Sequence, residues 1–139
     1  MFYKPIHFKI QELVDRETFR LFGQEAWMFL QPNALVALDG IRNYFDRTVF
    51  VNDWHFNGTY QYRGFRPKTC SVGADYSQHR FGNAFDLNVL GLSAEEVRKE
   101  ILAHKDDPRF RMITALEIGI QWVHFDCRNI AERIQLFEP

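Results

Sequence analysis

Two short segments in the second half of the chain alternate apolar and polar residues, and this alternation restricts the possible folds more than any other feature. They are residues 84–90, Ala-Phe-Asp-Leu-Asn-Val-Leu, and residues 122–128, Trp-Val-His-Phe-Asp-Cys-Arg. Successive side chains of a β-strand point to opposite faces, so each segment is predicted to be a strand with one apolar face. The other face then carries Asp86 on the first strand and His124 on the second. We therefore expect a sheet with apolar side chains on one face and polar side chains on the other.

Further helices and strands are predicted around these two segments. Apolar residues at three- and four-residue steps predict helices in residues 10–30 (two short ones, broken near Gly23), 34–45 and 93–104. The last of these opens with Ser93 and Glu96, a capping box. Runs rich in β-branched and aromatic residues predict strands at 48–54, 112–118 and 120–128, and residues 130–137 suit either a short helix or a strand. This order predicts an α+β fold with a small, largely antiparallel sheet.

The length and composition indicate one ordinary globular domain that spans residues 1–139. The chain has 46% hydrophobic and 25% charged residues, and no apolar run reaches the ~18 residues that cross a membrane. A formal net charge of −1 provides no electrostatic attraction to nucleic acid. The N-terminal residues show no signal-type apolar core, so we expect the protein to be made in the cytoplasm. We also expect a monomer with a small or locally charged partner. Cys70 and Cys127 are expected to be free thiols.

Three residues in and near these strands form a candidate metal site. A loop-like stretch, residues 57–76, precedes His79, and long loops often form functional rims. The loop can bring His79 toward Asp86, while His124 adds a second imidazole. Two nitrogens and one carboxylate oxygen, with a fourth position left for water, are a ligand set of catalytic zinc. The alternative for each residue alone is a surface or hydrogen-bonded core histidine, or a buried hydrogen-bonded carboxylate.

A longer pattern contains these residues. It is Ser-x-His-x-x-Gly-x-Ala-x-Asp, followed by a later Trp-x-His at residues 122–124, and it resembles the zinc D-Ala-D-Ala carboxypeptidases and L-Ala-D-Glu endopeptidases. These enzymes share one structural group with lysostaphin-type peptidases and the hedgehog signalling domain. A chance match at five fixed positions has a probability on the order of 10⁻⁴ or less. The matching residues are Ser77, His79, Gly82, Ala84 and Asp86.

The resemblance implies a function, a fold and a ligand set. It implies a zinc-dependent metallopeptidase with Zn²⁺ held by His79, Asp86 and His124, and with helices packed on one side of the sheet. The substrate would be a peptidoglycan stem peptide cleaved by a carboxypeptidase or endopeptidase reaction, for example by a phage endolysin that acts at the cell wall. A second class of function stays open, which is a zinc-binding but non-hydrolytic module that binds the cell wall or serves as a phage structural protein.

Two further positions are predicted to bind substrate. Gly64-Phe65-Arg66 is similar to the Gly-Tyr-Arg segment of the family, so Arg66 would donate hydrogen bonds to a substrate carboxylate or carbonyl, a task that suits its planar guanidinium. The alternative for Arg66 is a solvated loop arginine. By the same resemblance, Ser77 would hold the substrate or order the loop.

The general base is the point at which the sequence departs from the family pattern. Many relatives carry Asp or Glu three residues before the last histidine, but Gln121 occupies that position and cannot accept a proton from water. Glu117 is the nearest upstream acid, and a glutamate of the hedgehog domain lies similarly far upstream. We therefore predict Glu117 as the catalytic proton carrier, with Asp126 as the alternative. Asp126 shares the His124 face of its strand, and it could instead fix the tautomer of a ligand histidine. The alternative for Glu117 is a solvent-facing hairpin residue without a catalytic role.

Overall fold

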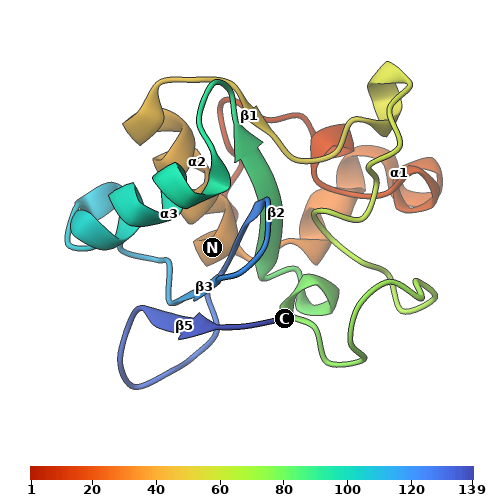
Figure 1. Ribbon diagram of the computed structural model, residues 1–139. Helices are drawn as coiled ribbons and strands as arrows, with labels where there is room; N and C mark the ends of the chain where they lie inside the picture. Colours follow the sequence, from red (N-terminus) through yellow and green to blue (C-terminus); the bar gives the residue numbers. More distant parts are fainter.

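The computed structural model describes residues 1–139 and contains a five-stranded mixed sheet with three α-helices (Figure 1). The strands are β1 (Val49–Phe50), β2 (Ala84–Val89), β3 (Ala115–Glu117), β4 (Val123–Asp126) and β5 (Gln135–Phe137). They follow the order β1-β2-β4-β3-β5 across the sheet, and neighbours are antiparallel except for β3 and β5, which are parallel. The α+β prediction is confirmed, and the sheet is largely antiparallel.

The three helices are α1 (Arg16–Phe22), α2 (Pro32–Phe45) and α3 (Ala94–Ala103), and each has a recognisable start. Asp15 caps α1 by accepting a hydrogen bond from Thr18 N at 3.1 Å, and Pro32 occupies the first turn of α2. The capping box predicted for α3 is present, because Ser93 Oγ accepts from Glu96 N at 3.1 Å and Ser93 N donates to the Glu96 carboxylate at 2.7 Å. Local sequence therefore sets where each helix begins.

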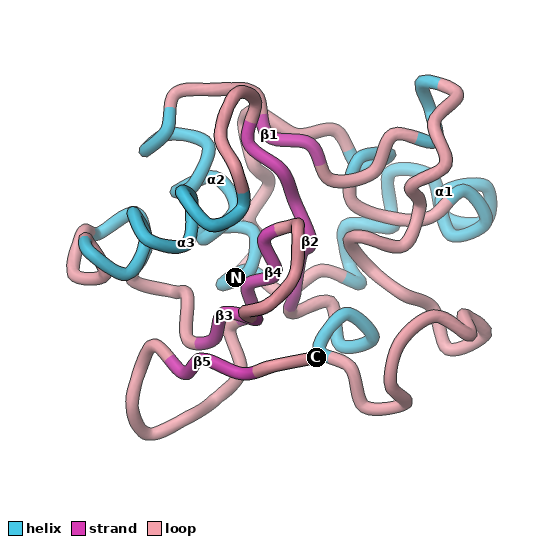
Figure 2. The backbone as a smooth tube through the Cα atoms, viewed as in Figure 1, coloured by secondary structure: helices cyan, strands magenta, loops and turns pink.

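One face of the sheet carries the hydrophobic core. Phe85 on β2 and Phe125 on β4 lie directly opposite each other, fully buried, with ring centroids 5.9 Å apart. Leu38 of α2 and Ile101 of α3 belong to the same core, and both helices lie on this side of the sheet (Figure 1; Figure 2). Helix α1 lies across β2 from them and contacts the neighbouring 3-10 segments. The expectation of helices on one side thus holds for α2 and α3, and the opposite face is left for polar residues.

The strand predicted for residues 48–54 is wrong beyond β1. After Phe50 the chain turns away from the sheet, and Asn52 N donates to Glu12 O at 3.0 Å. β1 pairs only with the end of β2, at Asn88 and Val89. Earlier along the same edge of β2, the loop that contains Arg63 takes the place of β1, since Asp86 N donates to Arg63 O at 2.7 Å. The β-branched and aromatic residues of this stretch thus pack against the N-terminal segment rather than extend the sheet.

Other boundaries differ less. The break expected near Gly23 is present, with φ of +54° at that residue, but the second of the two short helices is a 3-10 segment, Gly23–Phe29. The strands expected at 112–118 and 120–128 are shortened to β3 and β4. Of the two alternatives for residues 130–137, the structure has the strand, β5, which pairs with β3.

No helix has both the length and the apolar character that a membrane crossing requires. Cys70 and Cys127 are both free thiols. Burial raises the pKa of Cys127 to about 12, so this thiol is neutral at physiological pH.

Candidate metal centre

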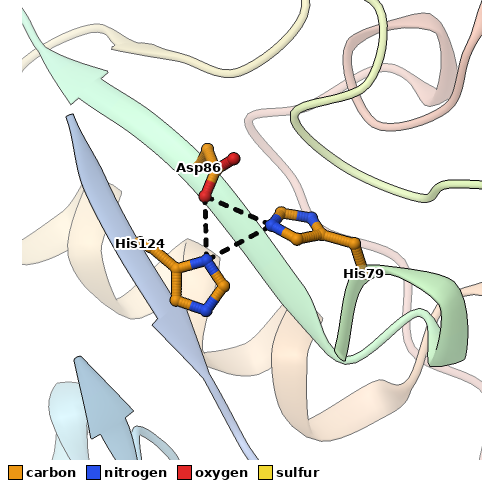
Figure 3. Close-up of side chains that lie close together, drawn as sticks. All are labelled: His79, Asp86 and His124. Carbon is orange, nitrogen blue, oxygen red and sulfur yellow. Dashed lines mark hydrogen bonds and ion pairs between the residues drawn. The ribbon is translucent and has the colours of Figure 1, made fainter. Parts of the chain in front are cut away.

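Three side chains converge on the polar face of the sheet: His79, Asp86 and His124 (Figure 3). Asp86 comes from β2, His124 from β4, and His79 from the 3-10 turn Gln78–Phe81 that precedes β2. Asp86 Oδ1 lies 3.2 Å from His79 Nε2 and 2.9 Å from His124 Nδ1, and the two nitrogens are 3.2 Å apart. All three residues are buried. The structure therefore brings together the three residues that the sequence predicts as metal ligands.

The register of the sheet places these groups in one row. Asp86 lies directly opposite His124, and His124 lies directly opposite Glu117 on β3. Directly opposite residues on antiparallel strands have neighbouring side chains on one face, with Cβ atoms ~4.5–5.5 Å apart. Backbone pairing alone therefore places Glu117 beside the cluster, although Glu117 is distant from Asp86 in the sequence.

His79 is positioned by a short turn whose two ends match the sequence motif. At the start of the turn, Ser77 Oγ accepts a hydrogen bond from His79 N at 3.3 Å. At its end, Gly82 has φ of +68°, and a Cβ at this position would lie 1.8 Å from Phe29 O. Glycine satisfies both the backbone conformation and the close approach. The Ser-x-His-x-x-Gly spacing therefore closes a turn that presents the imidazole to β2.

Hydrogen bonds on the far sides of the two imidazoles set their tautomers. His79 Nδ1 lies 2.8 Å from Gly64 O, which can only accept, so Nδ1 carries the proton. His124 Nε2 lies 3.0 Å from Asp126 Oδ2, so Nε2 donates there. When the rings are neutral, His79 Nε2 and His124 Nδ1 therefore direct their lone pairs toward Asp86 Oδ1. Both nitrogens can act as ligands without reorientation of the rings.

The cluster fits a metal ion in geometry and in donor chemistry. Two ligand atoms at ~2.0–2.1 Å from a tetrahedral zinc ion are about 3.3–3.4 Å apart. The three distances between donor atoms, 3.2, 3.2 and 2.9 Å, are close to that value. Two imidazoles and one carboxylate suit a first-row transition metal better than magnesium or calcium, which prefer oxygen ligands. The buried His-Asp-His cluster can therefore hold a metal ion.

The environment separates the pKa values of the three groups. Burial lowers the pKa of His79 and favours the neutral ring. Burial acts in the same direction on His124, but hydrogen bonds to Asp126 and Asp86 outweigh it and raise the pKa to about 9. Burial acts to raise the pKa of Asp86, but hydrogen bonds from the two histidines hold that pKa below its ordinary value. In the metal-free protein Asp86 thus pairs with protonated His124, and a metal must displace that proton.

A cavity of about 840 Å³ opens at the cluster. Its wall includes the three candidate ligands, Glu117 and residues 72–78. Residues 57–76 contain no helix or strand, as predicted, and the end of this stretch forms part of the rim. A ligand of peptide size can therefore reach the cluster from this side.

The two residues predicted to bind substrate also hold the candidate ligands in place. Arg66 lines the cavity, but its Nη2 donates to Asp86 Oδ2 at 3.2 Å and its Nε donates to Tyr62 O at 2.8 Å. Ser77 lines the cavity as well, and its hydroxyl is bonded to His79 N. Arg66 thus compensates the buried charge of Asp86, and Ser77 orders the turn that carries His79.

The two candidate proton carriers lie on opposite sides of His124. Glu117 Oε2 is 3.8 Å from Nδ1, the nitrogen that faces the cluster. Asp126 is fully buried and contacts Nε2, the nitrogen on the far side. Arg128 bonds both oxygens of Asp126, through Nε at 2.7 Å and Nη2 at 2.6 Å. Glu117 is therefore within reach of a water molecule at the cluster, whereas Asp126 is placed to orient His124. Gln121 is exposed and lies outside this cavity.

Sequence reasoning missed two neighbours of the cluster. The ring of Phe137 stands edge-on to His124, with centroids 5.5 Å apart, and Arg128 lies over that ring at 4.5 Å. Both residues line the cavity. Arg128 could have been predicted to lie near the cluster, because it is on the same face of its strand as His124. No sequence feature predicts the position of Phe137, because β5 reaches the site only through its non-local pairing with β3.

Comparisons with protein-family models, with curated proteins and with solved structures found no match to this chain. The fold and the site together define its class, which is an α+β protein with a buried His-Asp-His cluster able to hold a metal ion.

Proposed function

We propose that the chain is a zinc metallopeptidase that hydrolyses peptide bonds of peptidoglycan stem peptides. The observation that carries this proposal is the placement of Glu117, whose carboxylate lies 3.8 Å from the cluster-facing nitrogen of His124 and lines the cavity. A metal site that only stabilises a fold has no need of an additional carboxylate beside its ligands. The motif shared with zinc carboxypeptidases and endopeptidases of the cell wall supports the same reaction class.

The proposed chemistry divides between the metal and the chain. Zinc bound by His79, Asp86 and His124 would supply Lewis acidity to the scissile carbonyl and lower the pKa of water. Glu117 takes the proton of the attacking water and delivers it to the amine nitrogen as the carbon–nitrogen bond breaks. Asp126 holds His124 in the tautomer that leaves Nδ1 free. These roles assign the proton transfer to Glu117 rather than to Asp126.

Arg66 has a double role in this proposal. One of its nitrogens holds Asp86 Oδ2, and the guanidinium as a whole lines the cavity that would receive the substrate. It can therefore donate to a substrate carbonyl or carboxylate while it fixes a ligand. Ser77 acts through the turn that carries His79.

The proposal extends to the fold and the setting. We propose that the sheet is of the hedgehog and D-Ala-D-Ala peptidase type, which is supported by the motif's Asp and last His on adjacent strands, opposite the helices. A phage lysin that acts at the bacterial cell wall is the setting that fits this substrate.

The second candidate function is a zinc-binding module that recognises the cell wall without cleaving it. Gln121 favours it, because this residue stands where many peptidases of the family carry an acid. The presence of Glu117 beside the cluster favours the enzyme.

The deciding experiment incubates the zinc-loaded protein with purified peptidoglycan and analyses the released peptides by mass spectrometry. Loss of a terminal D-Ala identifies a carboxypeptidase, and new ends between L-Ala and D-Glu identify an endopeptidase. Glu117→Gln is the matched control, because it keeps the shape of the side chain and removes the proton acceptor. Sedimentation of the protein with peptidoglycan without any released peptide would support the binding module instead.

A further inference from the structure

A second cavity, of about 500 Å³, adjoins the metal centre. It shares Asp86 and Trp122 with the larger cavity, so the candidate metal site lies where the two meet. Its other lining residues are Tyr60, Arg63, Asn88 and Gln121. A substrate whose reacting bond lies at the cluster can therefore extend into both cavities.

Arg63 is the one cation that lines this second cavity, and it is held in place before any ligand arrives. Its backbone is fixed, since its N donates to Asn52 Oδ1 at 3.0 Å and its O accepts from Asp86 N at 2.7 Å. Its guanidinium lies 4.7 Å over the ring of Tyr60, and Nη2 donates to Asn88 Oδ1 at 2.7 Å. Such contacts orient the planar group without neutralising its charge.

Arg63 differs from the other two arginines near the site because it has no carboxylate partner. Arg66 pairs with Asp86 and Arg128 pairs with Asp126, whereas Arg63 forms no ion pair. No group of the chain accepts a hydrogen bond from its Nε or Nη1. Burial lowers the pKa of Arg63, which reflects the cost of removing its charge from water. A partly buried guanidinium with free donors gains most from an anion that offers two acceptor oxygens.

We propose that the second cavity is a carboxylate-binding subsite with Arg63 as its anchor, an inference that rests on the proposed peptidase function. The substrate is then a peptide that carries a carboxylate next to the scissile bond. Two groups of a stem peptide have this chemistry. A carboxypeptidase would place the C-terminal carboxylate of D-Ala against Arg63, and an endopeptidase would place the free carboxylate of D-Glu there.

The test compares three versions of one stem pentapeptide, L-Ala-D-Glu-L-Lys-D-Ala-D-Ala. One version has both carboxylates free, one has the C-terminus amidated, and one has the D-Glu carboxylate amidated. Binding is measured by calorimetry on the zinc-loaded Glu117→Gln protein, in which turnover is suppressed. Amidation of the carboxylate that contacts Arg63 should weaken binding by ~10–100-fold, and the peptide that loses affinity identifies the source.

Further substitutions assign the effect to Arg63. In an Arg63→Gln protein the same amidation should cost little, and Arg63→Lys should restore only part of the preference because a point charge cannot bind two oxygens in a fork. Arg16→Gln is the matched control. Arg16 also lies over an aromatic ring, 5.7 Å from the centroid of Trp54, but outside both cavities, so its loss should leave the preference unchanged.

Equal affinity for all three peptides in the protein that retains Arg63 overturns the subsite, and this result needs no arginine variant to fold. A preference that persists in folded Arg63→Gln overturns it as well. Hydrolysis by the unsubstituted protein is scored separately. Carboxylate preference without hydrolysis overturns the peptidase and leaves the subsite standing, whereas hydrolysis without the preference overturns the subsite alone.

Discussion

Replacement of Asp126 by asparagine converts one oxygen of a fully buried carboxylate into an NH₂ group. In the native protein Oδ2 accepts from His124 Nε2 at 3.0 Å and from Arg128 Nη2 at 2.6 Å, while Oδ1 accepts from Arg128 Nε at 2.7 Å. The asparagine must point its NH₂ group at one of these sets of donors. If it faces His124, Nε2 becomes an acceptor and the ring proton moves to Nδ1, the nitrogen that binds metal. If it faces Arg128 Nε, two N–H groups oppose each other out of water.

The effects of these two arrangements on zinc affinity and on stability can be predicted. Loss of the partner that fixes a ligand histidine typically lowers metal affinity by ~10–100-fold, which corresponds to ~1.4–2.8 kcal/mol. The free energy of unfolding of the metal-free protein should fall by ~1.5–3 kcal/mol, the usual contribution of a hydrogen bond to a charged group. Asp126 is wholly buried, so water cannot replace the lost partner.

Zinc affinity is measured by competition with a chromophoric chelator, and stability by urea unfolding of the metal-free protein. Arg128→Gln is the matched control, because it removes the other partner of Asp126 and keeps the contact with His124. It should lower stability but change zinc affinity much less than Asp126→Asn does. Native zinc affinity in Asp126→Asn, or an equal loss of affinity in Arg128→Gln, would refute the proposal that Asp126 holds His124 in the metal-binding tautomer.

Three further predictions concern the candidate metal ligands and Glu117. The purified protein should hold about one zinc per chain by elemental analysis, and His79→Ala or His124→Ala should lose most of it, so full zinc content in both would eliminate the site. Glu117→Gln should keep its zinc while peptide release falls by ~10²–10⁴-fold, and near-native release would exclude Glu117 as proton carrier. Because the pKa of His124 is raised to about 9 and that of His79 is lowered, metal binding between pH 6 and 8 displaces one proton. Apparent affinity should therefore rise by ~tenfold per pH unit as pH increases over that range, and a flat profile would contradict this.

The features that sequence predicted best are those with a local cause. Alternation along residues 84–90 and 122–128 is a property of single strands, so the polar faces that carry Asp86 and His124 followed directly from it. The Ser93 capping box and the break at Gly23 are likewise set by residues within a few positions of one another. These predictions needed no knowledge of how the strands pair.

The features that sequence missed depend on contacts between distant segments. The stretch after Phe50 reads as a strand from composition, but its hydrogen bonds go to the N-terminal segment instead. The contact of Arg66 with Asp86 and the placement of Phe137 against His124 follow from how the loop and β5 pack. No periodicity within either segment encodes such contacts.

Because Asp86, His124 and Glu117 form one row across three strands, metal binding would depend on the correct pairing of those strands. Side chains of a strand alternate between faces, so a slip of one residue between β2 and β4 would turn one ligand toward the core and dismantle the site at once. Misaligned chains would have almost no affinity for such an ion, whereas the aligned chain could hold it. An ion present at a thousand times its dissociation constant would favour the aligned state by ~4 kcal/mol. An ion held at this cluster would therefore favour the correct alignment of the sheet during folding, in addition to any part in the chemistry.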